Sequence, residues 1–167
     1  ADAFCPGEYA EQLDVALNQA EVILDASASV SLARHLALDI QADAPRASMF
    51  FTPSGNACVV LAEDAQRQVP LDILEMQYYR AIVHSEELTG HFKSQGQGFR
   101  YSQSCRDLTS QVPQDRVSLH ASLCANALKQ RFAGDESFAG VWSLKPPHHA
   151  VSFTPIPSAQ LVQIEHH

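Results

Sequence analysis

The spacing of hydrophobic positions predicts helices that alternate with short strands. Residues 9–20 place apolar side chains at the three- and four-residue spacing of a helix that buries one face. A short apolar run, 22–24, follows and stops at Asp25, after which residues 30–40 return to helical spacing. An apolar run of strand length that leads directly into a helix is typical of one strand-helix step in a sheet buried on both faces. We therefore expect a buried strand at 22–24.

The central part of the chain predicts a hairpin, a helix and a long connection. Two β-rich runs, 47–52 and 57–62, flank the turn-forming sequence Pro53-Ser54-Gly55-Asn56. After Pro70 the helical spacing returns, and we expect its apolar face to pack on the sheet. Residues 85–111 are rich in Gly, Ser and Gln and have little periodicity. Loops of this length are usually functional or mobile.

The strongest helical pattern lies near the end of the chain, over residues 115–132, with Gly134 as its stop. Its predicted buried stripe is Val117, Ala121, Cys124, Ala125, Leu128 and Phe132. Two further apolar runs, 141–144 and 150–153, predict a closing pair of strands. The order of elements predicts an α/β fold, a partial Rossmann-like layer with a mixed sheet and flanking helices.

Composition narrows the class of protein. A chain of 167 residues that is 46% hydrophobic and 18% charged is long enough for one domain with a substantial core. The net charge of −8 argues against a nucleic-acid partner, which normally requires a basic patch. No apolar run approaches the roughly 20 residues that span a bilayer, and no charged-then-apolar leader precedes the start. We therefore expect neither a nucleic-acid nor a membrane partner.

The cysteines and the chain ends predict a cytoplasmic protein. Cys5, Cys58, Cys105 and Cys124 are far apart, with no C-x-x-C pair, so a reducing cytoplasm suits them better than secretion and a zinc ribbon is not supported. Cys58 and Cys124 are expected in the core. The chain begins without Met, and 166–167, two histidines, are interpreted as the remnant of a purification tag.

Asp25 is the first candidate for a functional residue. In open α/β sheets, ligands bind just past the carboxyl ends of the strands, where Asp25 is predicted to lie. Ser27 and Ser29 follow it, and either could cap the next helix. Neither G-x-G-x-x-G nor G-x-x-x-x-G-K-[ST] follows a predicted strand, so the chain lacks a phosphate loop of either type. Asp25 could equally be structural and accept hydrogen bonds from the amides of the next helix.

Cys105 is the best candidate nucleophile. It lies in a polar loop beside Arg106, whose charge could stabilise a thiolate. The alternative is a structural thiol, because no histidine base is evident. For His120 and for His148-His149, ordinary structural roles are favoured over metal binding. A solvated rim is the favoured interpretation for the acidic residues Glu63, Asp64, Asp72 and Glu75.

Three segments together resemble the carboxyl-terminal half of the ThiF/MoeB/HesA adenylation fold, which ubiquitin-activating enzymes share. They are Glu21-Val-Ile-Leu-Asp25-Ala-Ser-Ala-Ser-Val30, the strand pair within 50–63, and Ser104-Cys105-Arg106-Asp107 ahead of the Ala-rich helix that ends at Lys129. The resemblance covers most of the chain and assigns 1–165 to that half of the domain. It is carried by the order of the segments, since strand-Asp-helix steps occur in many doubly wound folds.

The resemblance implies an activity, cofactors and partners for the intact protein. Members of the family use ATP and magnesium to adenylate the carboxyl terminus of a ubiquitin-like or sulfur-carrier protein, and some then capture it on a cysteine. By this resemblance Cys105, Arg106 and Asp25 would be catalytic, while Asp25, Ser27 and Ser29 would lie at the cofactor. A homodimer or heterodimer is expected.

The sequence departs from the family pattern in two places. The nucleotide loop belongs to an amino-terminal half that residues 1–167 do not contain, so this fragment alone is expected to bind no ATP and to be inactive. Members of the family usually have the sequence Asp-x-Thr-Asp-Asn at the end of this strand. Here Ala28 occupies the position of the second aspartate. A non-catalytic interaction or dimerisation domain is therefore the alternative. Half of another Rossmann-like enzyme would be favoured if the strands within 50–63 ran parallel.

Overall fold

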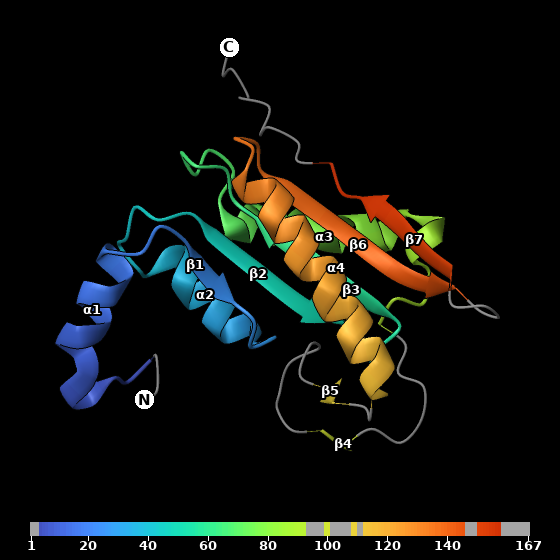
Figure 1. Ribbon diagram of the computed structural model, residues 1–167, viewed down its shortest axis with the longest axis horizontal. Coiled ribbons are helices and arrows are strands. Elements are labelled where there is room, and N and C mark those ends of the chain that lie inside the picture. The colour runs from blue at the N-terminus through green and yellow to red at the C-terminus, as the bar shows by residue number, and fades with distance from the viewer. Residues whose placement is uncertain (1–3, 93–98, 101–107, 110–111, 146–149, 158–167) are drawn as a thin grey trace, which may run out of the picture.

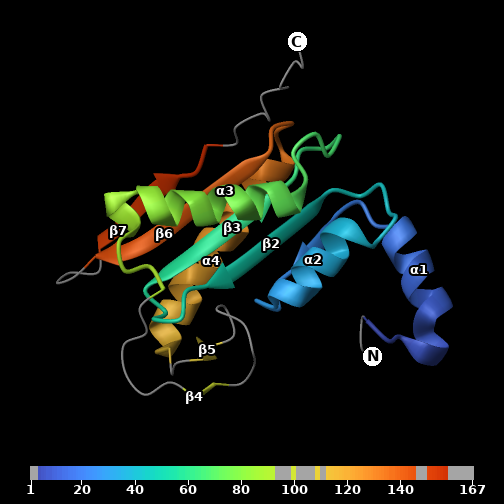
Figure 2. The same cartoon turned by 180° about the vertical axis from the view of Figure 1, so that it is seen from behind.

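The computed structural model describes residues 4–92, 99–100, 108–109, 112–145 and 150–157. It has the mixed α/β fold predicted from the sequence, with helices on both faces of a five-stranded mixed sheet (Figures 1 and 2). The helices of the described ranges are α1 (Ala10–Asn18), α2 (Val30–Leu38), α3 (Leu71–His84) and α4 (Gln114–Phe132), with 3-10 turns at Gly7–Tyr9 and Glu86–Leu88. The strands are β1 (Ile23–Asp25), β2 (Arg46–Phe51), β3 (Ala57–Ala62), β4 (Phe99–Arg100), β5 (Leu108–Thr109), β6 (Phe138–Lys145) and β7 (Ala150–Pro155).

The sheet has the order β1-β2-β3-β6-β7 and changes character along its width. β1 and β2 are parallel and joined through α2, whereas each later neighbouring pair is antiparallel. The hairpin and the closing strand pair predicted from the sequence are confirmed, and the antiparallel hairpin removes the feature that would favour another Rossmann-like enzyme. β1, β2 and β6 point the same way. The end of the sheet at which these three strands finish is called the carboxyl edge below, and it is distinct from the edge strands β1 and β7.

β1 corrects one expectation. The sequence predicts a strand buried on both faces, but β1 is an edge strand of three residues, and its Leu24 side chain is 46% exposed. Ile23 packs in a small cluster with Leu36 of α2, while Leu24 points to the opposite face of the sheet, as alternation requires. No described helix covers Leu24, so an apolar run alone does not show how many layers surround a strand.

Two helical layers cover the sheet. Leu71, Leu74 and Tyr78 of α3 pack on one face against β3 and β6, and α2 lies on the same side. Cys124, Ala127 and Leu128 of α4 pack on the other face. β3 lies between the layers, and all six of its residues are buried, as the hydrophobic run 57–62 leads one to expect for a central strand.

The predicted faces of α1 and α4 need correction. No residue of α1 is fully buried, and the helix packs only through partly buried side chains such as Leu17. In α4 the buried stripe is rotated from the predicted one: Ala121, Ala125 and Phe132 are exposed. His120 and Arg131 are buried instead, because carbonyl groups of distant segments accept their hydrogen bonds. The predicted stripe therefore omitted two buried polar side chains.

The predicted connection 85–111 contains two short strands. β4 and β5 pair antiparallel and lie beyond the carboxyl edge of the main sheet, near the first turns of α4 (Figures 1 and 2). None of the helices in the described part of the chain combines the length and the apolar character that a membrane crossing needs.

Candidate functional site

Asp25 ends β1 at the carboxyl edge, where the sequence predicts it. It is 3% exposed, and its Oδ1 accepts hydrogen bonds from the Ser27 amide at 2.9 Å and from the Ser27 hydroxyl at 2.6 Å. The Ser48 hydroxyl on β2 donates to Oδ2 at 3.5 Å. Both carboxylate oxygens therefore have donors, and Asp25 organises the turn between β1 and α2.

The turn after Asp25 sets the start of α2. Ala28 has a φ of 59°, a left-handed conformation that asparagine, aspartate and glycine adopt more readily than alanine. Ser29 then caps the helix, and its hydroxyl accepts the Leu32 amide at 3.2 Å. Of the two serines considered as caps, Ser29 is thus the cap, while the Ser27 hydroxyl binds Asp25 and accepts the Ser29 amide at 3.1 Å.

On the α3 side of this turn lies a cluster of buried polar and aromatic groups. Ala28 packs against the core cluster that contains Tyr78. The Tyr78 hydroxyl and His91 Nε2 share a hydrogen bond of 2.8 Å, and burial lowers the pKa of His91 to about 4, so the His91 ring is neutral. Glu75 is buried as well, 3.1 Å from the Tyr79 hydroxyl and 3.7 Å from Arg34 of α2.

The start of α4 closes the other side of the carboxyl edge. Arg116 donates to the Asn56 side-chain oxygen at 2.7 Å. His120 Nε2 donates to the Gly55 carbonyl at 3.0 Å, which leaves the buried Nδ1 without a partner. Burial lowers the pKa of His120 by more than the bond to the Gly55 carbonyl raises it, and the nearby Arg116 charge lowers it further, so the ring is neutral. These contacts hold α4 to the β2–β3 hairpin.

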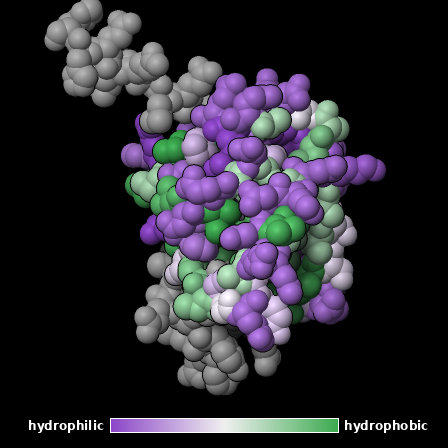
Figure 3. Space-filling model, turned by 90° about the vertical axis from the view of Figure 1, so that its left-hand side faces the viewer, coloured by the Kyte–Doolittle hydropathy of each residue, from purple (hydrophilic) through white to green (hydrophobic). Residues whose placement is uncertain are grey.

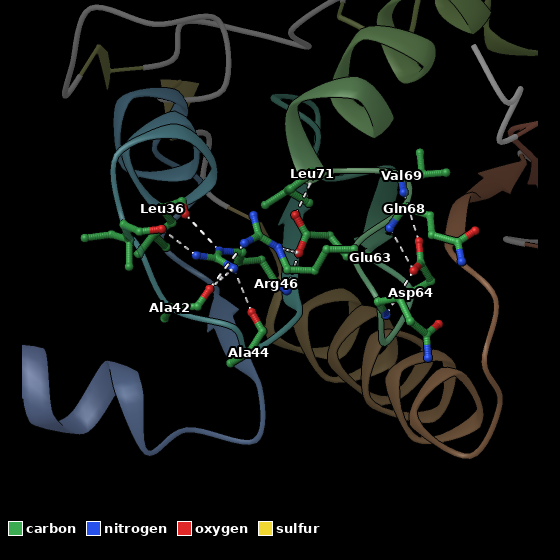
Figure 4. Close-up of polar contacts among 12 residues, drawn as sticks. Leu36, Ala42, Ala44, Arg46, Glu63, Asp64, Gln68, Val69 and Leu71 are labelled. Carbon is green, nitrogen blue, oxygen red and sulfur yellow. Dashed lines mark hydrogen bonds and ion pairs between the residues drawn. The ribbon is translucent and has the colours of Figure 1, made fainter. Parts of the chain in front are cut away.

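A second polar cluster occupies the opposite edge of the sheet, and it was not anticipated from the sequence. Arg46, at the start of β2, is 1% exposed, and its guanidinium points toward the end of α2 (Figure 4). It donates to four carbonyls, those of Leu36, Ile40, Ala42 and Ala44, at 2.7–2.9 Å. Arg46 thereby satisfies one carbonyl in the last turn of α2 and three in the connection from α2 to β2.

Acidic residues complete this cluster and correct the prediction of a solvated rim. Glu63, 1% exposed, accepts hydrogen bonds from the amides of Arg46 and Leu71 and from the Arg67 side chain, at 2.8–2.9 Å. Asp64 accepts three amides (Figure 4). Burial alone would raise the pKa of Asp64, but the amides of Gln68, Val69 and Gln66 together lower it. Both acids therefore have structural partners and are not a solvated rim.

The cysteines divide into core residues and one outside the described part. Cys58 and Cys124 are buried against each other between β3 and α4, as predicted. A hydrogen bond between the two thiols, together with burial, raises the pKa of Cys58. Cys5 is exposed. Cys105 and Arg106 lie outside the described residues, as does the His148-His149 pair, so their predicted roles stay predictions.

The Asp25 turn carries a single carboxylate, that of Asp25 itself. Asp25 has donors on both oxygens, and Ala28 offers a methyl group where the adenylation family that the sequence resembles has a second carboxylate. Among the residues the structure describes, no three histidine, cysteine or acidic side chains converge to hold a metal ion. The carboxyl edge therefore combines hydrogen-bond donors and acceptors that fix its own turns.

The sequence was compared with protein-family models and with curated proteins, and neither comparison finds a match.

Proposed function

We propose that this chain is the carboxyl-terminal part of a ThiF-type adenylation domain, which in the intact protein activates the carboxyl terminus of a ubiquitin-like or sulfur-carrier protein. The observation that carries the proposal is the strand-turn-helix step at Asp25, which begins a sheet that is parallel at one end and antiparallel at the other. The order of segments in the sequence supports the same assignment.

The open edge of β1 supports a role inside a larger sheet. β1 is short and parallel to its one described neighbour, and its outer edge has no partner strand among the described residues. Leu24 on this strand is an exposed apolar side chain. Figure 3 views this end of the molecule, where apolar patches interrupt a hydrophilic surface. A parallel strand added at β1 would place its own carboxyl end beside Asp25.

The chemistry assigns different parts to the two halves of such a domain. A carboxylate is a poor electrophile, and transfer of an adenylyl group from ATP gives it a good leaving group. The phosphate loop for that step would come from the amino-terminal half. In this chain, Asp25 would position the turn that faces the nucleotide. The Cys105 thiolate, favoured by Arg106, would attack the acyl-adenylate and form the thioester as AMP leaves.

Thioester formation by the intact protein tests this proposal. With ATP, magnesium and candidate ubiquitin-like proteins, we expect an adduct that thiols cleave and that Cys105→Ala abolishes. Cys5→Ala, which changes an exposed cysteine, is the matched control. ATP–pyrophosphate exchange reports adenylation without the cysteine. Absence of both exchange and adduct would overturn the proposal, and an adduct that survives Cys105→Ala would remove that residue from it.

Calorimetry with residues 1–167 tests the division between the two halves. We expect no measurable heat of ATP binding, because the described residues supply no phosphate cradle. Tight binding would show that this chain contains a nucleotide site of its own.

A non-catalytic subunit that pairs with a complete partner is the second candidate. Ala28 favours it, because the position adopts the backbone conformation that aspartate readily takes but supplies no carboxylate. Ala28→Asp in the intact protein separates the two candidates. A gain in exchange activity on this substitution favours the non-catalytic subunit, and an active protein with Ala28 in place excludes it.

A further inference from the structure

An aromatic shelf lies on the α4 face of the sheet, beside the helix and not beneath it. It consists of Phe138 and Trp142 of β6 and Phe153 of β7, whose ring centroids are 4.8–6.2 Å apart. Phe153 lies across Gly140, where a Cβ atom would come within 2.5 Å of its ring. Glycine at this position therefore allows the Phe153 ring to approach the backbone of β6 closely.

The shelf is the floor of a groove. α4 supplies one wall through Leu123, Ala127 and Gln130, and the groove has a volume of about 840 Å³. Figure 1 shows α4 crossing the sheet while β7 lies beside it, and none of the described helices covers β7 on that face. Phe153 is 46% exposed and Val151, on the same strand face, is 44% exposed. Contiguous exposed apolar side chains of this kind mark binding surfaces more often than single ones do.

The charges around the groove are unbalanced. Asp135 and Glu136 are exposed at the end nearest Phe138, and a neighbouring hollow extends from them to Asp64. The one cation in the lining, Arg131, turns inward and donates to the carbonyls of Gly134 and Glu63 at 2.6 Å. The end of the groove nearest Phe138 is therefore acidic, and it lies next to the apolar floor.

We propose that this groove binds an extended peptide segment of a partner protein, one that carries aromatic or branched aliphatic side chains followed by lysine or arginine. The apolar side chains lie on the aromatic shelf, and the basic residues face Asp135 and Glu136.

Charge selects this occupant over a second copy of the chain. Each copy carries a net charge of −8, and the same acidic groove end would be present on both. Like charges oppose such self-association, whereas a basic segment is attracted. The groove lies away from the Asp25 turn, so the inference is independent of adenylation activity.

Fluorescence of Trp142, the single tryptophan of the chain, gives a direct measurement. The probe is the hexapeptide Leu-Ala-Phe-Ala-Arg-Lys, acetylated at its amino terminus and amidated at its carboxyl terminus. It is compared with a version that ends in Glu-Glu and with a version in which serine replaces both the leucine and the phenylalanine. We expect the first peptide to change the Trp142 emission and to bind at least about 10-fold more tightly than the other two.

Variants of the chain test the two parts of the groove separately. We expect Phe153→Ala to abolish binding, and the double variant Asp135→Asn, Glu136→Gln to weaken it about 5- to 10-fold and to remove its dependence on salt. The matched controls are Val83→Ala and Glu11→Gln, which change exposed residues elsewhere. Circular dichroism confirms that each variant is folded.

Three results would overturn the inference: equal binding of the acidic peptide, unchanged binding by both groove variants, or a dimer in light scattering that Phe153→Ala dissociates. The last of these would assign the groove to a second copy of the chain.

Discussion

Buried charged side chains of this protein stabilise the loops at the ends of its strands. Glu63 accepts three hydrogen bonds from groups on β2, on α3 and in the loop between β3 and α3. Arg46 binds carbonyls in the last turn of α2 and in the connection that follows it. A buried charge with all of its hydrogen bonds made is tolerated, whereas removal of one partner leaves an uncompensated group. We therefore expect the largest single-residue effects on stability at this cluster.

Glu63→Gln tests the cluster. The amide NH₂ group would face a donor, since all three partners of Glu63 are N–H groups. We expect the free energy of unfolding in urea to fall by about 3 kcal/mol. Glu11→Gln, an exposed acid on α1, should change it by less than about 0.5 kcal/mol. Equal stability of the two variants would mean that Glu63 does not hold the loops together.

His91 makes stability depend on pH. The pKa of His91 falls from 6.5 to about 4 on folding because the ring is buried. As the pH decreases, His91 is therefore protonated in the unfolded chain before it is protonated in the folded protein. The stability that His91 contributes is present above pH 6.5 and is lost as the pH falls toward 4. At pH 5 this loss amounts to about 2 kcal/mol.

His91→Gln removes this titration and keeps a side chain that can hydrogen-bond the Tyr78 hydroxyl. Between pH 7.5 and pH 5, urea unfolding should show that the variant loses about 2 kcal/mol less than the wild type. His84→Gln, at an exposed histidine, serves as the control. A variant that loses as much stability as the wild type would show that His91 is protonated in the folded state.

At the scale of elements, the start of α2 shows how the Asp25 turn is assembled. Asp25 binds Ser27, the Ser27 hydroxyl accepts the Ser29 amide, and Ser29 caps the helix. Each contact fixes the residue that makes the next one. The turn therefore acts as a unit, with Ala28 in its left-handed conformation.

Ser29→Ala tests the cap. Loss of the bond to the Leu32 amide should lower the free energy of unfolding by about 1 kcal/mol. Ser122→Ala is the matched control, because the Ser122 hydroxyl bonds the Ser118 carbonyl on the exposed side of α4, where alanine favours the helix. Destabilisation of both variants to the same extent would contradict a capping role for Ser29.

At the scale of the whole molecule, stability is distributed unevenly. β3 is buried throughout and lies between two helical layers, whereas α1 has no fully buried residue and β1 lies at an open edge. Amides whose segments bury few apolar contacts open most easily. The end of the molecule that carries the open β1 edge is therefore expected to be its least stable part.

Native-state hydrogen exchange tests this distribution. The amides of β3 should exchange only through global unfolding, while those of α1 and β1 should exchange faster through local opening. Within the adenylation proposal, the β1 amides of the intact protein should become protected, because a neighbouring strand pairs with them. Uniform protection across this chain would contradict the open edge.

Local patterns in the sequence determine the elements of this protein. The helical spacing after Pro70, the turn residues 53–56 and the serine that caps α2 act over a few residues, so the helices and the hairpin could be predicted. The position of Asp25 at a strand end followed in the same way. These features need no knowledge of distant segments.

Only the tertiary structure decided which faces are buried and which polar groups have partners. His120 and Arg131 are buried because they reach carbonyls 65 and 68 residues away, and Glu63 is buried because Arg46 and Leu71 donate to it. The place of β1 at an edge depends on which strands pair, not on its own hydrophobic run. A sequence records the polarity of a side chain, whereas its burial is set by partners that folding brings from elsewhere.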